Sequence, residues 1–457
     1  MVRAMEKLFG TDGVRGHANR FPTTVEVALF LGKAVASVLR GARKRVIIGK
    51  DTRLSGYMFE SALVAGLNSM GVDTLMTGPV PTPAIAYLTR AYRADAGIMI
   101  SASHNPFFDN GIKIFGPDGF KLPDEVERQI EQMVAEQKFP PPKDTELGRN
   151  KRIDDADGRY IEFAKATFLK GGTLEGMKIF LDCANGAAHR VAPATFWELN
   201  AQVTVIGDKP NGININDNVG SLHPKKMQMG VVETESQVGI ALDGDADRIV
   251  MADENGKLLD GDIVLSICAK AMKERGLLRN NRVVVTVMTN LGVVKHLESL
   301  GIEVITSKVG DRYVLQKMQE FDAALGGEQS GHMIFLDHNT TGDGIVSALQ
   351  VMQVMIEEKK RLSELAEAIK QYPQLLLNVR VEKKPPLKEL VSVQAVIKKV
   401  EQQLGSEGRV VVRYSGTEQL CRVLVEGRET DFVKTCAEEI ASVIEKEIGS
   451  CVASPVM

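Results

Sequence analysis

Three aspartates, Asp243, Asp245 and Asp247, are spaced two residues apart directly after the apolar run 238–242. If the backbone there is extended, all three carboxylates point to one side. Three anions so close together repel one another unless a cation lies among them, and a donor set made only of oxygens selects a hard ion such as Mg²⁺ over zinc. A calcium loop of the EF-hand kind is disfavoured, because it needs glycine where Arg248 stands. The triplet therefore predicts a Mg²⁺ site rather than a solvated acidic turn.

A second candidate for chemistry is Ser103, in the polar turn 101–106 after the apolar run 97–100. No GxSxG motif surrounds it, which disfavours acyl transfer of the α/β-hydrolase kind. If the fold brings the Asp triplet opposite, the hydroxyl becomes a candidate phosphoryl carrier facing a metal ion. An ordinary turn begun by Asn105-Pro106 would look the same. Lys113, in the next apolar run, is a candidate general acid/base or charge clamp, although a lone strand lysine is more often solvated.

Two polar loops nearer the C-terminus could bind a ligand. In the segment 413–417, one arginine, two hydroxyls and the amides around Gly416 form a suitable cradle for a phosphate, although a simple β-turn is an equal alternative. In the segment 327–332, Glu328 and Ser330 offer an acceptor and a hydroxyl that suit sugar hydroxyls or an amino group, but an ordinary surface loop would look much alike. The glycine-rich segment 10–16 has neither Walker A nor Rossmann spacing, so it is not interpreted as a nucleotide site.

The elements that must position these loops follow a repeated plan. Short Val- and Ile-rich runs alternate with amphipathic stretches, which is typical of an α/β protein with largely parallel sheets. Three segments repeat the order strand, helix, strand, strand, polar turn and a further strand. Their polar turns follow the runs 97–100, 238–242 and 323–325. Because ligands collect beyond the carboxyl ends of strands in open α/β sheets, the three turns are where chemistry is expected.

The plan changes after residue 372, where a smaller α+β unit is predicted. We therefore expect four domains, each carrying one of the polar loops: 1–153 with the serine, 154–257 with the metal site, 258–372 with the sugar loop and 373–457 with the phosphate loop. The polar, proline-containing tail around Cys451 is expected to fray.

Composition excludes several classes of protein. The chain has 457 residues with 56 basic and 59 acidic side chains, and its formal charge of −3 argues against electrostatic binding of nucleic acid. No apolar run approaches the roughly 18 to 20 residues that a membrane span requires. The five cysteines are scattered without paired spacing, which argues against a disulfide framework and a zinc site. The first residues lack the pattern of a secretory signal, so a cytoplasmic location is expected.

Together these segments resemble the α-D-phosphohexomutase superfamily, and the likeness spans nearly the whole chain, from the segment 9–13 to the segment 413–417. The resemblance implies four domains around a central cleft, the first three being similar α/β units. Within the superfamily, the segments 9–16, 101–106 and 327–332 are most similar to those of bacterial phosphoglucosamine mutases. Those enzymes interconvert glucosamine 6-phosphate and glucosamine 1-phosphate on the route to UDP-N-acetylglucosamine.

The resemblance also implies roles for single residues. Those that it places at the Mg²⁺ ion are Ser103, Asp243, Asp245 and Asp247. Those that it places at the sugar or its phosphates are Glu328, Ser330, Arg413, Ser415, Gly416, Thr417, Arg248 and His104. Those that it implicates in phosphoryl or proton transfer are Ser103, Lys113, Arg15 and His332.

The implied reaction is a ping-pong exchange. Phosphorylated Ser103 gives its phosphoryl group to O1 of glucosamine 6-phosphate, the bisphosphate turns around, and its 6-phosphoryl group returns to Ser103. One Mg²⁺ per subunit, a hexosamine or hexose 1,6-bisphosphate activator and a small-molecule sugar phosphate as the partner follow, and a homodimer is left open. Three rivals stay open as well: a phosphomannomutase or phosphoglucomutase of the same superfamily, a metal-dependent phosphatase and a catalytically silent sugar-phosphate sensor.

Overall fold

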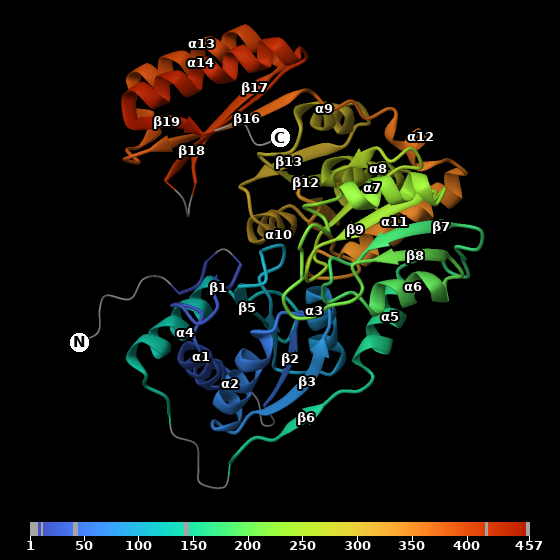
Figure 1. Ribbon diagram of the computed structural model, residues 1–457, viewed down its shortest axis with the longest axis vertical. Helices are drawn as coiled ribbons and strands as arrows, with labels where there is room; N and C mark the ends of the chain where they lie inside the picture. The colour runs from blue at the N-terminus through green and yellow to red at the C-terminus, as the bar shows by residue number, and fades with distance from the viewer. Residues whose placement is uncertain (1–7, 11, 40–43, 141–145, 416–418, 454–457) are drawn as a thin grey trace. The chain divides into compact units, whose positions relative to one another are not determined.

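The computed structural model describes residues 8–10, 12–39, 44–140, 146–415 and 419–453. These form two compact units. We name them the large unit, Met1–Thr286 with Ile302–Ala368, and the small unit, Val287–Gly301 with Ile369–Met457. Each unit has its own sheets and helices and is described by itself (Figure 1).

The first sheet of the large unit has six strands in the order β1-β5-β4-β2-β3-β6. Their bounds are β1 Val14–His17, β2 Arg45–Lys50, β3 Asp73–Pro79, β4 Ala96–Ile100, β5 Asp109–Phe115 and β6 Asn150–Arg152. Strands β4, β2 and β3 are parallel neighbours, and β5 is antiparallel to β4. The turn that carries Ser103 therefore joins the last parallel strand to the antiparallel one.

Both faces of this sheet are covered by helices, which explains why the middle of its central strand β2, residues 46–48, is apolar and fully buried. Val46 and Ile48 of β2 belong to a core shared with helices α1 (Val25–Val38) and α2 (Gly56–Asn68). On the opposite face, a Cβ at Gly49 would lie 2.5 Å from the Ile85 side chain of α3 (Thr82–Ala91). Figure 1 shows α1 and α2 on one side of the sheet and α3 on the other.

The second and third sheets repeat this plan. The second, in the order β11-β10-β9-β7-β8, consists of β7 Lys178–Asp182, β8 Gln202–Ile206, β9 Val238–Leu242, β10 Ile249–Ala252 and β11 Leu258–Leu259. The third, in the order β13-β12-β14-β15, consists of β12 Arg282–Thr286, β13 Glu303–Ser307, β14 Leu325–Gly327 and β15 Met333–Phe335. In each, three parallel strands are followed by an antiparallel one, β10 or β15. The predicted repeat is confirmed.

The remaining helices of the large unit connect these strands. They are α4 Asp124–Glu136, α5 Ala156–Ala166, α6 Val191–Glu198, α7 Lys225–Glu233, α8 Gly261–Glu274, α10 Asp311–Glu320, α11 Gly344–Glu358 and α12 Leu362–Ala366. Two of them begin at an aspartate whose carboxylate accepts a backbone N–H of the first turn, Asp260 for α8 and Asp343 for α11. Such caps fix where each helix starts.

The small unit is an antiparallel sheet in the order β17-β18-β16-β19, packed against two helices. Its elements are α9 Leu291–Ser299, β16 Gln374–Val381, α13 Val391–Leu404, β17 Arg409–Tyr414, β18 Leu420–Glu426, α14 Thr430–Ile448 and β19 Gly449–Ala453. The α+β prediction is confirmed. The expected fraying is wrong for residues 449–453, because β19 pairs with β16 and so satisfies its backbone groups in a sheet.

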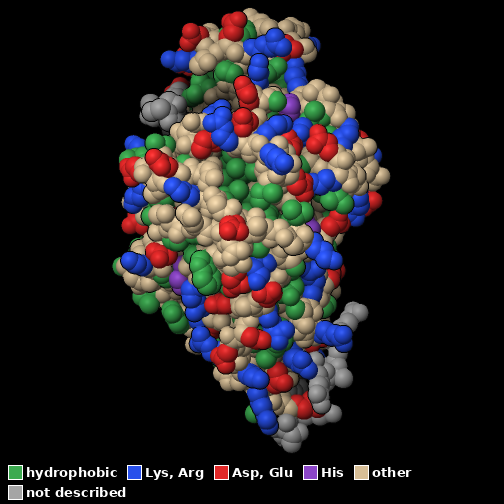
Figure 2. Space-filling model, turned by 90° about the vertical axis from the view of Figure 1, so that its right-hand side faces the viewer, with side chains coloured by type: hydrophobic (Ala, Val, Ile, Leu, Met, Phe, Trp, Pro, Cys, Tyr) green, Lys and Arg blue, Asp and Glu red, His purple; other side chains and the backbone are tan. Residues whose placement is uncertain are grey.

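The surface carries charges of both signs. Figure 2 shows acidic and basic side chains interspersed over one face, in keeping with 56 basic and 59 acidic residues. Among the helices that the structure describes, none combines the length and apolar character that crossing a lipid bilayer requires.

Candidate active site

Ser103 lies in the turn after β4 and is 1% exposed. Its φ of +52° is in the left-handed region, which residues other than glycine rarely adopt. Its hydroxyl donates to Asp243 Oδ2 at 2.5 Å, although 140 residues separate the two in the chain. The structure thus brings together the serine and the Asp triplet, as the repeat requires.

Asp243, Asp245 and Asp247 lie in the turn between β9 and β10, and all three are buried. Each offers one carboxylate oxygen, and these atoms lie within 4.8 Å of one another. The expected extended backbone is wrong, because the segment is a turn in which Ala246 has φ +55°. The carboxylates meet because the chain folds back between two strands, and alternation along a strand is not the cause.

The donor set fits a divalent cation. Asp245 Oδ1 and Asp247 Oδ1 are buried oxygens without a hydrogen-bond partner among the described residues. Burial first, and then Asp247 and Asp245, raise the pKa of Asp243 well above its ordinary value, because a further negative charge in this place is unfavourable. An ion bound by oxygen ligands would satisfy the unpaired oxygens and neutralise the repulsion.

Lys113 lies on β5 at the edge of this cluster and is 1% exposed. Its Nζ is 2.9 Å from Asp245 Oδ2, 2.9 Å from Asp247 Oδ2 and 3.3 Å from Asp12 Oδ2. Burial favours loss of its proton, but the three carboxylates outweigh burial and raise the pKa of Lys113 well above its ordinary value. The solvated alternative is excluded, and Lys113 lies against the Asp triplet in its charged form.

Arg15 on β1 and His104 in the serine turn approach the same place. The Arg15 guanidinium pairs with Asp12, while its Nε is buried without a hydrogen-bond partner in the described structure. His104 Nδ1 lies 3.3 Å from Ser103 Oγ. Burial, followed by the charge of Arg248 and Arg15, lowers the pKa of His104 to about 3, so the imidazole is neutral near pH 7.

Arg248 and His332 flank the far side of the Asp triplet. Arg248 Nε is 3.9 Å from Asp247 Oδ1 and has no hydrogen-bond partner among the residues described. His332 is buried, and its Nδ1 lies 3.7 Å from the same oxygen. Because His332 Nε2 accepts the backbone N–H of Gly342, we assign its proton to Nδ1. Arg15 and Arg248 thus each keep a buried N–H that could bind an anion.

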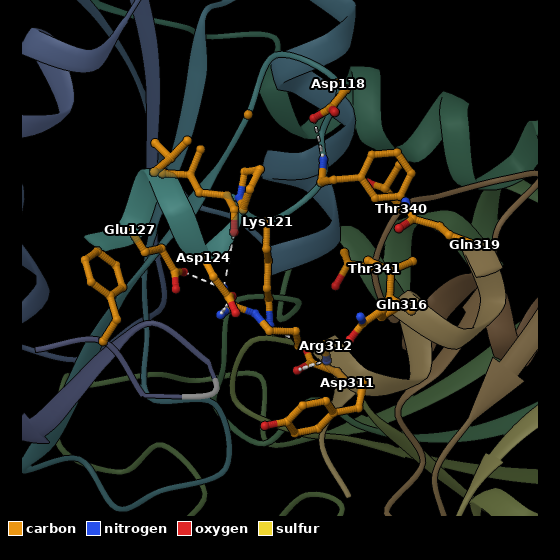
Figure 3. Close-up of a pocket in the computed structure, with 18 of the residues that line it drawn as sticks. Asp118, Lys121, Asp124, Glu127, Asp311, Arg312, Gln316, Gln319, Thr340 and Thr341 are labelled. Carbon is orange, nitrogen blue, oxygen red and sulfur yellow. Dashed lines mark hydrogen bonds and ion pairs between the residues drawn. The ribbon is translucent and has the colours of Figure 1, made fainter. Parts of the chain in front are cut away.

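A chain of alternating charges extends from this cluster toward α10. Lys121 pairs with both Asp12 and Asp311, and Asp311 Oδ2 lies 3.8 Å from His332 Nε2. Arg312 donates to Glu127 at 2.5 Å. Lys121, Asp311, Arg312 and Glu127, but neither Asp12 nor His332, are among the residues that line a cavity of about 930 Å³. Figure 3 shows these four side chains around it. Because its cations are already paired, we assign no phosphate to this cavity.

The third polar loop places Glu328 and Ser330 after β14. Glu328 is 8% exposed, and its Oε1 accepts the backbone N–H of Gly310 at 2.9 Å. Ser330 is exposed. The loop lies directly against β10, because a Cβ at Gly331 would be 1.8 Å from the carbonyl oxygen of Ile249. One side chain is thus held in place and the other is free to meet a ligand.

The fourth loop lies in the small unit. Arg413 of β17 stands directly opposite Arg422 of β18, and burial followed by Arg422 lowers the pKa of Arg413. Ser415 is buried, and its N–H donates to the carbonyl oxygen of Leu420 at 2.9 Å. Gly416 and Thr417 lie outside the described residues. Two facing guanidiniums repel each other, and an anion bound between them would relieve the repulsion.

Sequence reasoning missed several residues of the large unit's site. Asp12, Lys121 and Asp311 connect Lys113 to His332 through charge pairs, and Thr82 donates a hydrogen bond to Asp245. Asp12 stands in the glycine-rich segment 10–16, so that segment has a role other than nucleotide binding. Its signal was a charged residue beside Arg15 in a loop too rich in glycine for a helix.

Four consecutive stretches match models of phosphoglucomutase/phosphomannomutase domains. These are the alpha/beta/alpha domains I, II and III, over residues 6–141, 158–256 and 260–372, and the C-terminal domain, over residues 376–443. The chain belongs to the phosphoglucomutase/phosphomannomutase family. Membership of this family, the α-D-phosphohexomutases, confirms the resemblance predicted from the sequence motifs.

Similar members of the family include chlamydial proteins. The phosphoglucosamine mutase of Chlamydia abortus is 59% identical over 453 residues, covering 98% of this chain and 99% of that one. The phosphoglucosamine mutase of Chlamydia caviae is 60% identical over 454 residues with the same coverage.

Solved structures of the family share the fold at low identity. A phosphoglucomutase/phosphomannomutase family protein from Burkholderia thailandensis has a TM-score of 0.81 at 21% identity, covering 97% of this chain and 99% of that one. The Aspergillus fumigatus N-acetylphosphoglucosamine mutase, solved in complex with GlcNAc-6P and magnesium, has a TM-score of 0.68 at 16% identity and covers 96% and 95%.

Proposed function

We propose that this chain is a phosphoglucosamine mutase, an isomerase that interconverts glucosamine 6-phosphate and glucosamine 1-phosphate. The observation that carries the proposal is the approach of Ser103 Oγ to Asp243 Oδ2 at 2.5 Å inside a buried cluster of three carboxylates. A hydroxyl in this place suits a phosphoryl carrier and no simple binding role. The choice of glucosamine as the sugar rests on relatives of that name at 59–60% identity over nearly the whole chain.

The metal site would consist of Ser103, once phosphorylated, with Asp243, Asp245 and Asp247. Bound there, Mg²⁺ would supply charge neutralisation for the transferred phosphoryl group. The residues of the chain perform the other tasks. Ser103 Oγ loses its phosphoryl group to a sugar hydroxyl and regains one from the bisphosphate, and the surrounding burial excludes water that would hydrolyse the phosphoserine.

Proton transfer is assigned to Lys113, with Arg15 and His332 in support. Each transfer releases the proton of the attacking sugar hydroxyl, and the freed Ser103 Oγ must gain one. Lys113 Nζ lies 2.9 Å from two carboxylates of the cluster that Ser103 contacts, and the pKa of Lys113 is raised, so it starts as the charged acid. It would donate the proton that Ser103 Oγ gains and recover one from the attacking sugar hydroxyl. The Nε–H groups of Arg15 and Arg248 are buried and have no hydrogen-bond partner among the described residues. Each could donate a hydrogen bond to the phosphoryl group during transfer.

Sugar and phosphate recognition are assigned to the other loops. Glu328 and Ser330 would hold the sugar, and His104, neutral near pH 7, would donate or accept a hydrogen bond beside Ser103. The non-reacting phosphate would be bound by the small unit, through Arg413 and the loop that follows it. Arg422, which stands opposite Arg413, is added to that proposal.

The decisive test is covalent. We expect intact mass spectrometry to show one added phosphate after incubation with glucose 1,6-bisphosphate and Mg²⁺, mapped to Ser103 by peptide sequencing. Ser103→Ala should take up none. Ser61→Ala is the matched control, because Ser61 lies on the exposed face of α2 and donates only to its own helix. Uptake by Ser103→Ala would overturn the proposal.

The alternative substrate class is glucose or mannose phosphate, which the family's own description favours. Turnover of glucosamine, glucose and mannose 6-phosphates should be measured side by side. We expect the highest kcat/KM for the amino sugar. A preference for mannose would make the chain a phosphomannomutase, whereas release of inorganic phosphate would indicate a phosphatase.

Three further features complete the proposal. The product supplies UDP-N-acetylglucosamine synthesis, and a hexose 1,6-bisphosphate keeps the serine phosphorylated. A cytoplasmic location is in keeping with the four described cysteines, which are free and buried. A homodimer is left to be tested by light scattering.

A further inference from the structure

Arg53 is a fully buried arginine whose every donor is used. It follows β2, and its side chain is 0% exposed. Nε donates to Asp51 Oδ2 at 2.8 Å. The four remaining N–H groups face the backbone carbonyl oxygens of Ser103, Asn105 and Pro106 in the serine turn and that of Asp109 at the start of β5. An arginine has five N–H donors in a rigid plane, so this set of partners is complete.

The carbonyl oxygens that Arg53 holds belong to a turn with an unusual backbone. Ser103 has φ +52°, and its N–H donates to Ser101 Oγ at 2.9 Å, while Ser101 Oγ in turn donates to Asp51 Oδ2 at 2.7 Å. A serine in the left-handed region is strained and persists only where its surroundings fix it. The Asp51–Arg53 pair supplies that constraint from beneath the turn.

A second side chain, Asn216, binds two of the carbonyl oxygens that Arg53 binds. Asn216 lies in a loop of the second domain. Its Nδ2 donates to the carbonyl oxygen of Ser103 at 2.9 Å and to that of Asn105 at 3.0 Å. Arg53 Nη2 donates to these oxygens at 2.9 and 2.8 Å. The turn is thus held by hydrogen bonds from Arg53, in the domain that carries the turn, and from Asn216, in the domain that carries the Asp triplet.

Further hydrogen bonds join the loop that carries Arg53 to the domain that carries Asn216. Thr52 Oγ1 donates to the carbonyl oxygen of Asn185 at 2.5 Å, and the Leu54 N–H donates to that of Gly212 at 2.9 Å. The Asp triplet's own turn lies against the same place, because a Cβ at Gly244 would be 2.5 Å from the carbonyl oxygen of Ser103. The residues on both sides of Arg53 therefore join the loop after β2 to loops of the second domain, while the Asp triplet's turn packs directly against Ser103.

We propose that Arg53 and Asn216 are positioning residues for phosphoryl transfer: by fixing the carbonyl oxygens of residues 103 and 105, they hold Ser103 Oγ in reach of the carboxylate cluster. The inference rests on the proposed function in that Ser103 carries the phosphoryl group. Neither side chain contacts the reacting oxygen. Their effect is on alignment, where a displacement of about 1 Å can lower a rate by about 100-fold.

The variants are Asn216→Ala, Arg53→Lys and the control Asn218→Ala. Asn216→Ala removes two donors while Arg53 still binds both oxygens, so the protein should fold. Lysine offers donors from one point and cannot reproduce the planar fork, so Arg53→Lys should have the larger effect. Asn218 lies in the same loop as Asn216, is exposed, and its amide donates to the neighbouring Asp217.

Two measurements separate the proposal from the function on which it rests. Amide hydrogen exchange of residues 101–111, in protein without substrate, should be at least about 10-fold faster in Asn216→Ala than in wild type or Asn218→Ala. In single-turnover phosphoryl uptake and in steady-state assays, kcat should fall about 10- to 100-fold with KM within about 3-fold of wild type.

Each outcome decides a different claim. Unchanged amide hydrogen exchange in the serine turn of Asn216→Ala would overturn the claim that Asn216 holds this turn, regardless of the effect on activity. Faster exchange with an unchanged kcat would overturn the positioning role. A rise in KM at constant kcat would assign Asn216 to substrate binding. A wild-type protein that never gains phosphate would overturn the proposed function, and the exchange data would still report whether the turn is held.

Discussion

The two units hold their charges in opposite ways. In the large unit, Ser103, Lys113 and Asp243 are at most 1% exposed, and each ionised group contacts an opposite charge or a hydroxyl. In the small unit, Arg413 and Arg422 are only partly buried and face each other as like charges. The carboxylates of the first arrangement could hold a divalent cation, whereas an anion would stabilise the second. We propose that the chemical step takes place in the large unit and that the small unit binds the non-reacting phosphate.

The same contrast is visible in two carboxyl groups. Burial raises the pKa of Asp343 in the large unit to about 6. In the small unit, hydrogen bonds from Lys295 and Tyr372 lower the pKa of Glu407 to about 2. Burial disfavours the ionised form of Asp343 in the large unit. Hydrogen bonds near solvent favour the ionised form of Glu407 in the small unit. The predictions that follow separate the two regimes.

Metal removal should have the largest effect. Treatment with EDTA should abolish mutase turnover, and Mg²⁺ should restore it. Adding Mg²⁺ should also raise the thermal unfolding midpoint of wild type by several degrees, because the ion relieves repulsion among three buried carboxylates. Asp245→Asn should lose most of that rise and Arg413→Ala should keep it. Full activity in EDTA would contradict the metal site.

Lys113→Met should lower kcat by roughly 100- to 1,000-fold, the usual contribution of a general acid/base. The same variant should bind Mg²⁺ several-fold more tightly, because an ammonium group 2.9 Å from two carboxylates competes with the ion. Isothermal titration measures the second effect. Weaker Mg²⁺ binding in Lys113→Met would show that the lysine organises the ligands and does not compete with the metal.

Arg413→Ala should raise KM by roughly 10- to 100-fold, the loss expected for a charge-assisted hydrogen bond to phosphate. Because the chemistry lies in the large unit, kcat should change by less than about 3-fold. Arg128→Ala, on the exposed face of α4, is the control. A fall in kcat at constant KM would place Arg413 in the chemical step and remove the contrast between the units.

Asp343→Asn should have the smallest effect, and one that depends on pH. The folded protein holds the Asp343 proton more tightly than the unfolded chain, whose ordinary pKa is 3.8. Wild-type stability relative to the variant should therefore fall as pH rises from about 4 through 6, by at most about 3 kcal/mol. Asparagine retains the cap of α11. Denaturant unfolding between pH 4 and 7 measures the difference.

Glu407→Gln is the matched test in the small unit. The pKa of Glu407 is lowered, so its stabilising contribution is present above the ordinary value of 4.5 and is lost as pH falls toward 2. Between pH 5 and 7 the difference between this variant and wild type should stay constant. A pH-dependent difference like that of Asp343→Asn would mean that the two units hold charge in the same way.

The sequence predicted the fold well wherever local pattern controls it. Runs such as 97–100 and 238–242 are apolar on both faces because helices cover both sides of the sheets, and polar turns end them at the ligand-binding edge. The plan predicted that Ser103 and Asp243 lie in equivalent turns, and only the fold shows that the two side chains meet. Residues 449–453 were missed because their strand depends on a partner, β16, that lies about 70 positions earlier in the chain.

The supporting residues were beyond the reach of sequence. Lys121 and Asp311 are ordinary surface residue types, and only the fold shows that they meet. Arg53 follows a strand in a polar turn, where a solvated cation is the usual expectation, and nothing local indicates that it is 0% exposed. Long-range pairing determines such positions, so single-residue patterns carry no signal for them.

Gly331 limits how the loop 327–332 can be exchanged among relatives. Its φ is +90°, any side chain would strike the Ile249 backbone, and its own carbonyl oxygen accepts the Ile249 N–H at 3.1 Å. A graft of the loop 327–332 from an enzyme with another sugar preference would therefore have to bring a glycine at this position and a matching β10 edge. Exchange of the loop 327–332 in this chain would therefore require matching changes in the second domain, because the loop packs directly against Ile249 of β10.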